Sequence, residues 1–218
     1  MNRFDLQDKS DEYVKELADK GEFIGIFEYG MRLYNQDKNE EAFSYLYKLK
    51  DYNNFFIWER LIDIAYYEVK GIVSDEELFQ LLLKRHNYGV SSFSYILAYC
   101  YKDGIGTEKN IKKYIEVLKM VANDGSRYAT IELAECYEKG FGVRKNLKKA
   151  FDLYYHYVDE HFKMDFECAY KSALYMLNEW GGAKKDMMQI EYHLRYAARV
   201  ENEAKKLYIE LFNKEPEW

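Results

Sequence analysis

The sequence predicts an all-α protein, an α-solenoid of about five stacked antiparallel helix pairs. Three observations carry this prediction. Proline occurs once among 218 residues, at Pro216, so helices can run without interruption. Glycine is sparse, with 12 residues, and each one is therefore informative as the end of an element. A segment in the middle of the chain also repeats itself, which is the sequence signature of repeat architectures.

The internal repeat emerges when the chain is aligned with itself at an offset of 36 residues. LAYCYKDGIG at 97–106 then falls on LAECYEKGFG at 133–142, and KNIKK at 109–113 falls on KNLKK at 145–149. Ten positions between 97 and 113 are identical in the two copies. The chain therefore contains two copies of one structural unit, at about 93–128 and 129–164.

Each copy is expected to form a helix, a tight turn and a second helix. The segment 126–138 places its apolar residues on one face at helical spacing. Glycine ends many helices because it tolerates left-handed backbone, and Asn146 is expected to cap a second helix at about 147–160. The predicted turn glycines of the two copies are Gly104, Gly106, Gly140 and Gly142.

The pattern L-A-x-x-Y-x-x-G-x-G-V-x-x-[DN]-x-x-K-A, present at 133–150, resembles the Sel-one-like repeat. That family is a helix-pair relative of the tetratricopeptide repeat. The resemblance implies pairs that stack into a curved superhelix and a role in protein–protein interaction, often as an adaptor or assembly scaffold. It implies no catalytic residues and no cofactor.

Weaker copies flank the two clear ones. Ser74 and Glu77 predict a capping box within one of them, and Gly181 with Gly182 predicts the turn of another. Polar, degenerate end repeats are expected in a solenoid. The chain is therefore predicted to form a single repeat domain over 1–218, with a leading helix at 9–20, repeats at about 22–52, 55–89, 93–128, 129–164 and 165–200, and a capping helix at 201–213.

Composition narrows the functional classes. The net charge is −6 and no long Lys/Arg-dense stretch occurs, which argues against nucleic-acid binding. The N-terminus shows no signal-peptide pattern, and no run of 18 apolar residues is present, which argues against a membrane span. Three cysteines are too few for a disulfide framework. We therefore expect a cytoplasmic protein.

No motif of an established catalytic or cofactor site is present, so we expect neither an enzyme nor a bound metal. His156 and Glu160 lie four residues apart, but a zinc site requires more converging ligands. Cys100 and Cys136 occupy equivalent repeat positions and are expected to be small buried hydrophobes rather than a redox or metal pair. An enzyme with an unrecognised site stays a remote alternative.

The first helix of each pair is expected to line the concave groove of the solenoid. The register that turns Leu133, Ala134 and Tyr137 towards the partner helix turns another stripe outwards. That stripe is acidic and aromatic, and it predicts a protein or peptide partner that is basic. The candidate partner-binding residues are Glu59, Asp63, Tyr66, Ile96, Tyr99, Asp103, Tyr128, Glu132 and Glu135.

Two functions agree with such a groove. One is a non-catalytic adaptor that holds a partner in its concave surface. The other is an immunity or inhibitor protein that neutralises a cationic bacterial toxin, because an acidic surface complements a basic one. The sequence does not separate the two.

Overall fold

A computed structural model describes residues 6–89, 93–159 and 165–216, and within these ranges every regular element is helical. The all-α prediction is confirmed. The α-helices are α1 (Asp11–Asp19), α2 (Phe23–Asn35), α3 (Asn39–Leu46), α4 (Phe55–Asp63), α5 (Asp75–Tyr88), α6 (Ser94–Asp103), α7 (Ile111–Asn123), α8 (Arg127–Lys139), α9 (Leu147–Asp159), α10 (Phe166–Leu177), α11 (Met187–Ala197) and α12 (Asn202–Phe212). Short 3-10 segments lie at Tyr47–Leu49 and Trp180–Gly182.

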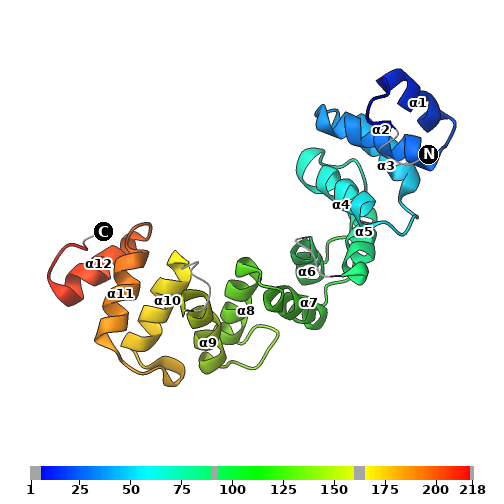
Figure 1. Ribbon diagram of the computed structural model, residues 1–218. Helices are drawn as coiled ribbons and strands as arrows, with labels where there is room; N and C mark the ends of the chain where they lie inside the picture. The colour runs from blue at the N-terminus through cyan, green and yellow to red at the C-terminus, as the bar shows by residue number, and fades with distance from the viewer. Residues whose placement is uncertain (1–5, 90–92, 160–164, 217–218) are drawn as a thin grey trace. The chain divides into compact units, whose positions relative to one another are not determined.

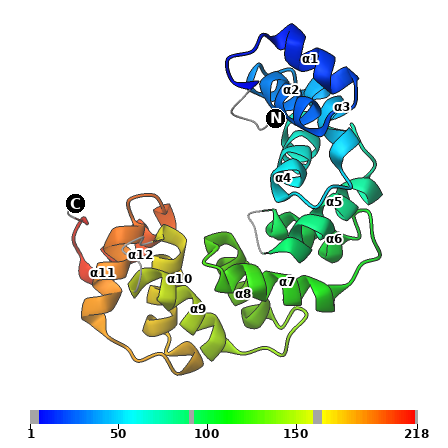
Figure 2. The same ribbon diagram turned by 45° about the vertical axis from the view of Figure 1, so that its right-hand side comes forward.

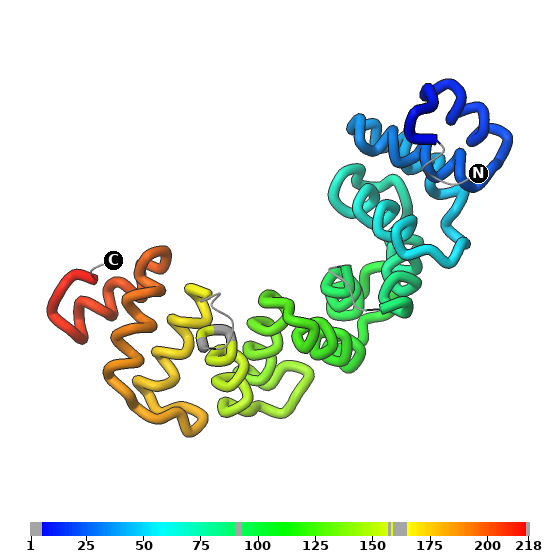
Figure 3. Tube along the Cα trace, viewed as in Figure 1, coloured from blue at the N-terminus to red at the C-terminus, as the bar shows by residue number. Residues whose placement is uncertain are grey.

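The helices group into two compact units, Met1–Tyr114 and Ile115–Trp218. In the first unit α2 packs against α3 and α4 packs against α5 (Figure 1). In the second unit α8 packs against α9 and α10 against α11, and α10 also lies beside α9 (Figure 2). Helices that follow one another along the chain are therefore neighbours in space, as the tube in Figure 3 shows within each unit. The single-domain organisation expected from the sequence stays a prediction.

Polar side chains cap the helices at the predicted positions, Ser74 and Asn146, and also at Asn110. The Ser74 hydroxyl accepts a hydrogen bond from the Glu77 backbone N–H at 3.2 Å, which is one half of the predicted capping box. The Asn146 side chain accepts from the Lys149 N–H at 3.0 Å, and Asn110 accepts from Lys113 at the same distance. These bonds satisfy amide donors that have no partner within their own helix.

The two clear repeats close their first helix in the same way. Gly104 and Gly140 are left-handed, with φ of 80° and 77°, and their N–H groups donate to the carbonyls of Cys100 and Cys136 at 2.9 and 2.8 Å. The second turn glycines are also left-handed, Gly106 with φ 65° and Gly142 with φ 67°. Such a glycine C-cap satisfies carbonyls that the last helical turn leaves unpaired.

Two turn glycines pack directly on a helix start of the preceding pair. A Cβ built on Gly106 would lie 2.0 Å from the carbonyl oxygen of Asp75, at the start of α5. A Cβ built on Gly181 would lie 2.5 Å from the carbonyl carbon of Leu147, at the start of α9. No side chain fits at either place. The glycine turn therefore both closes its own pair and docks on the one before it.

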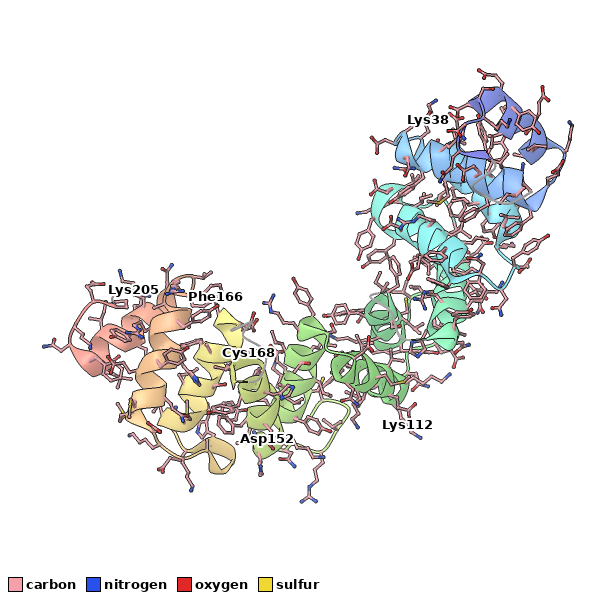
Figure 4. All side chains as sticks on the ribbon, in the orientation of Figure 1. Lys38, Lys112, Asp152, Phe166, Cys168 and Lys205 are labelled. Atoms are coloured by element: carbon pink, nitrogen blue, oxygen red, sulfur yellow. The ribbon has the colours of Figure 1, made fainter. Side chains whose placement is uncertain are left out.

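Leucine, isoleucine and alanine make up most of the interior, and several tyrosines and the three cysteines are buried among them. In the second unit the side chains of Tyr154 and Tyr175 are fully buried, and the Tyr154 hydroxyl donates to the Glu138 carboxylate at 3.3 Å. Cys100, Cys136 and Cys168 are all buried and free (Cys168 is labelled on α10 in Figure 4). Burial raises the pKa of the Cys100 thiol to about 11. The interpretation of Cys100 and Cys136 as buried hydrophobes is confirmed.

Candidate functional site

The residues expected to bind a partner lie on the first helices of the pairs, and the first unit contributes α4 and α6. Glu59 and Asp63 are on α4, and Tyr66 follows in a π-helical segment, Ile64–Glu68, that continues α4. The segment is closed by a bond from the Val69 N–H to the Ile64 carbonyl at 2.8 Å. π-Helical turns are rare in proteins, and those that do occur are often found at functional sites.

The π-helical segment displays two tyrosines side by side. Tyr66 and Tyr67 are 42% and 60% exposed, and their rings meet edge to face with centroids 4.8 Å apart. Burial, the neighbouring Tyr66 and the Asp63 carboxylate together raise the pKa of Tyr67. The prediction from the sequence assumed an uninterrupted α-helix through this segment. It therefore did not include Tyr67 among the outward-facing candidates. The adjacent pair of tyrosines was the signal available in the sequence.

The two carboxylates of α4 are already bonded within the unit. Glu59 accepts from Nε and Nη2 of Arg85 on α5, at 3.1 and 2.9 Å. Asp63 accepts from the Tyr34 hydroxyl of α2 and from Arg60 at 3.3 Å. The bond to Asp63 raises the pKa of Tyr34. These carboxylates hold neighbouring helices together. Because their negative charge is partly balanced by Arg85 and Arg60, only the remaining charge can attract a partner.

The three candidates on α6 differ in their surroundings. Ile96 is 6% exposed and packs in the interior, so its side chain offers almost no surface to a partner. The Tyr99 hydroxyl is hydrogen-bonded to the Tyr95 hydroxyl at 2.7 Å, and the Lys102 ammonium lies 4.9 Å from the centre of its ring. Asp103 is exposed and forms no ion pair with any residue that the structure describes.

The second unit contributes three candidates, all on α8. Tyr128 is 62% exposed, and the guanidinium of Arg127 lies 4.9 Å from its ring centre. Glu132 and Glu135 are partly exposed. Glu135 accepts a hydrogen bond from Lys139 at 2.5 Å, and this bond raises the pKa of Lys139. Each unit therefore presents its own acidic and aromatic surface along a first helix.

The described residues contain no group of three or more His, Cys, Asp or Glu that could hold a metal ion. His156 is described and exposed, whereas Glu160, the other half of the spaced pair noted in the sequence, lies outside the described residues. In the described part of the chain, no helix combines the length and the apolar character needed to cross a membrane.

Comparison with known proteins identifies the repeats. The family model described as Sel1 repeat matches residues 92–113 and 127–155. No curated protein matches the sequence. Sel1 repeats generally mediate protein–protein interaction, and proteins built from them are typically non-catalytic scaffolds.

Among the solved structures that share the fold are the following two. One is a protective antigen of uropathogenic Escherichia coli strains that displays an SLR fold, with a TM-score of 0.72 and 14% identity; the match covers 93% of this chain and 44% of that one. The other is a Sel1 repeat protein from Oxalobacter formigenes, with a TM-score of 0.67 and 22% identity, covering 83% of this chain and 73% of that one. The predicted α-solenoid and the resemblance are both confirmed: residues 92–113 and 127–155 match the Sel1 repeat, and the chain has the SLR solenoid fold.

Proposed function

We propose that this chain is a non-catalytic scaffold that binds a basic protein partner through the acidic and aromatic surfaces of its first helices. The observation that carries the proposal is the exposed pair Tyr66 and Tyr67, displayed by a π-helical turn next to Asp63. Exposed tyrosines are enriched among the residues that dominate binding energy at interfaces. The faces of their rings also attract lysine and arginine side chains.

Charge supports the same kind of partner. The chain carries 38 acidic against 32 basic residues, and Asp103 adds to the surface of the first unit a carboxylate that pairs with no described basic residue. Complementary charge speeds encounter and rejects partners of the wrong sign. A partner with lysines and arginines at its contact face gains from both the carboxylates and the tyrosine rings.

Co-purification of the full chain from its native host, followed by mass spectrometry, would supply the partner, and isothermal titration calorimetry would then measure its Kd. We expect a basic protein. Asp103→Lys and Tyr67→Ala are each expected to weaken binding by about tenfold, because each removes an attraction at the contact face.

Matched controls are available on α1 of the same unit. Glu16→Lys reverses an exposed charge and Tyr13→Ala removes a tyrosine that is 42% exposed, and neither residue belongs to a first-helix surface. Both controls should leave the Kd unchanged. An acidic partner, or equal effects of the test and control variants, would refute the proposal.

A further inference from the structure

A second candidate site lies in the second unit, in a cleft of about 410 Å³ between α8, α9 and the last turns of α7. Its floor is formed by Leu133, Tyr137 and Leu153. Its rim carries Lys119 and Asn123 from α7 and Lys149, Asp152 and His156 from α9 (Asp152 is labelled in Figure 4). At 100° per residue, Leu133 and Tyr137 lie on the side of α8 away from Tyr128 and Glu135. The cleft is therefore separate from the acidic surface.

The described residues of the rim carry an excess of positive charge. Lys119 forms no ion pair with any described residue. Lys149 likewise has no carboxylate partner there, and its ammonium lies 5.2 Å from the centre of the Tyr137 ring. Among the described residues of the rim the one acid is Asp152, which is bonded at 2.9 and 3.1 Å by Lys148. Asp152 is thus neutralised by a lysine outside the cleft, and no carboxylate of the described residues pairs with Lys119 or Lys149.

The apolar floor of the cleft indicates which kind of anion could bind to these lysines. Leucine and tyrosine side chains offer an apolar surface from which a bound group can exclude water. Inorganic phosphate or a similar small ion gains nothing from such a floor. A peptide that carries a carboxylate next to an apolar side chain can use both parts of the site, and the Asn123 amide supplies a further hydrogen-bond donor at the rim.

We propose that this cleft binds an acidic segment of a protein partner. A glutamate or aspartate of the segment lies between Lys119 and Lys149, and a neighbouring apolar side chain packs on the partly exposed Tyr137 and Leu153. The site is independent of the acidic surface, so the scaffold holds oppositely charged segments at two places.

The test uses the full chain and a short fluorescein-labelled peptide with glutamates beside a leucine. Its twin carries glutamine at each glutamate. Fluorescence anisotropy measures the Kd, and amide shifts of the 15N-labelled chain locate the contact. We expect the glutamate peptide alone to bind and to shift amides of the residues that line the cleft. Lys119→Glu should weaken binding of the glutamate peptide by about tenfold, because the charge reversal replaces attraction by repulsion. Added salt should weaken it too.

Lys185→Glu is the matched control, since Lys185 is an exposed lysine of the same unit outside the cleft. It should leave the Kd unchanged while circular dichroism shows that both variants stay helical. Equal binding of the glutamine peptide, an unchanged Kd for Lys119→Glu, or shifts confined to other residues would each overturn the proposal. Inorganic phosphate that shifts the same amides and displaces the peptide would assign the cleft to small anions, and would overturn it as well.

Discussion

The ammonium group of Lys149 lies 5.2 Å from the ring centre of Tyr137, and Lys113 holds the same position over Tyr101 at 5.1 Å. The two pairs are separated by the 36-residue period of the repeat. In each pair the tyrosine belongs to the end of a first helix and the lysine to the start of the second. The contact therefore clamps the glycine turn between them, and it explains why both residue types recur at these positions.

Removing the ammonium group of Lys149 should loosen this clamp. Lys149→Met keeps the apolar stem and loses the cation, so the free energy of unfolding should fall by about 0.5–1 kcal/mol, as expected for an exposed cation–π pair. Urea denaturation followed by circular dichroism measures the change. Lys145→Met, at an exposed lysine of the same turn, should cost less than about 0.5 kcal/mol. Equal losses in the two variants would contradict the clamp.

The docking glycines should be far less tolerant of a side chain than the open ones. Gly106→Ala places a Cβ against the Asp75 carbonyl, and the backbone must shift, whereas Gly71 has φ 80° but nothing within 4 Å of an added Cβ. Gly71→Ala therefore measures left-handed strain alone, about 1–2 kcal/mol. Gly106→Ala should exceed it by about 1–3 kcal/mol of overpacking. The midpoints of urea unfolding compare the two variants, and similar midpoints would refute the close approach.

Tyr154 should make the protein sensitive to alkaline pH. Burial, followed by the charges of Glu138 and Glu135, holds its pKa well above the usual value of 10.0. Above pH 10 the unfolded chain loses the Tyr154 proton while the folded chain retains it, so stability falls as pH rises, by up to about 1.4 kcal/mol per pH unit.

Tyr154→Phe removes this contribution, and the unfolding free energy should then decline less steeply above pH 10. Below pH 10 the same variant loses its hydrogen bond to Glu138, at a cost of about 1 kcal/mol. Tyr52→Phe, at a residue that is 52% exposed, is the control and should keep the wild-type slope. Denaturation curves collected across the pH range give both slopes, and an unaltered slope in Tyr154→Phe would disprove the assignment.

Arg32 should govern the order of the N-terminal segment. Its guanidinium donates to the carbonyls of Lys9 and Leu6 at 2.9 and 2.6 Å, and to Asp11 at 2.6 Å. Lysine offers a single ammonium and cannot reproduce this fork of donors. Arg32→Lys should therefore speed amide hydrogen exchange in α1 while leaving α10 and α11 protected. Unchanged amide exchange in α1 would show that the packing of α1 on α2 is enough to keep the N-terminal segment ordered.

The repeat made much of the fold predictable. The self-alignment located the glycine turns, and the caps at Ser74 and Asn146 followed from side chains that compete for backbone N–H groups. The π-helical turn at Ile64–Glu68 was not predictable, because it depends on how the end of α4 packs rather than on local propensity. The burial of Ile96 was missed for a related reason, since one helical register was applied to every first helix.

The candidate surfaces were harder to predict than the fold. The residue types indicated acids and tyrosines along the first helices. They did not reveal that Arg85 donates hydrogen bonds to Glu59 or that the Tyr34 hydroxyl donates to Asp63. These partners come from other helices and become neighbours only on folding. The cleft over Leu133 had no sequence signal, since its lysines and leucines are ordinary residues of the repeat.

The contacts of Gly106 with Asp75 and of Gly181 with Leu147 bear on how such a chain evolves. A tandem copy of the unit inherits both halves of this contact, the glycine turn and the helix start that receives it. Each new copy can therefore attach to its predecessor without any compensating mutation, and gene duplication alone can lengthen the array. Loss of one such glycine would instead interrupt the array at a single joint, which favours the insertion or deletion of whole units over changes within them.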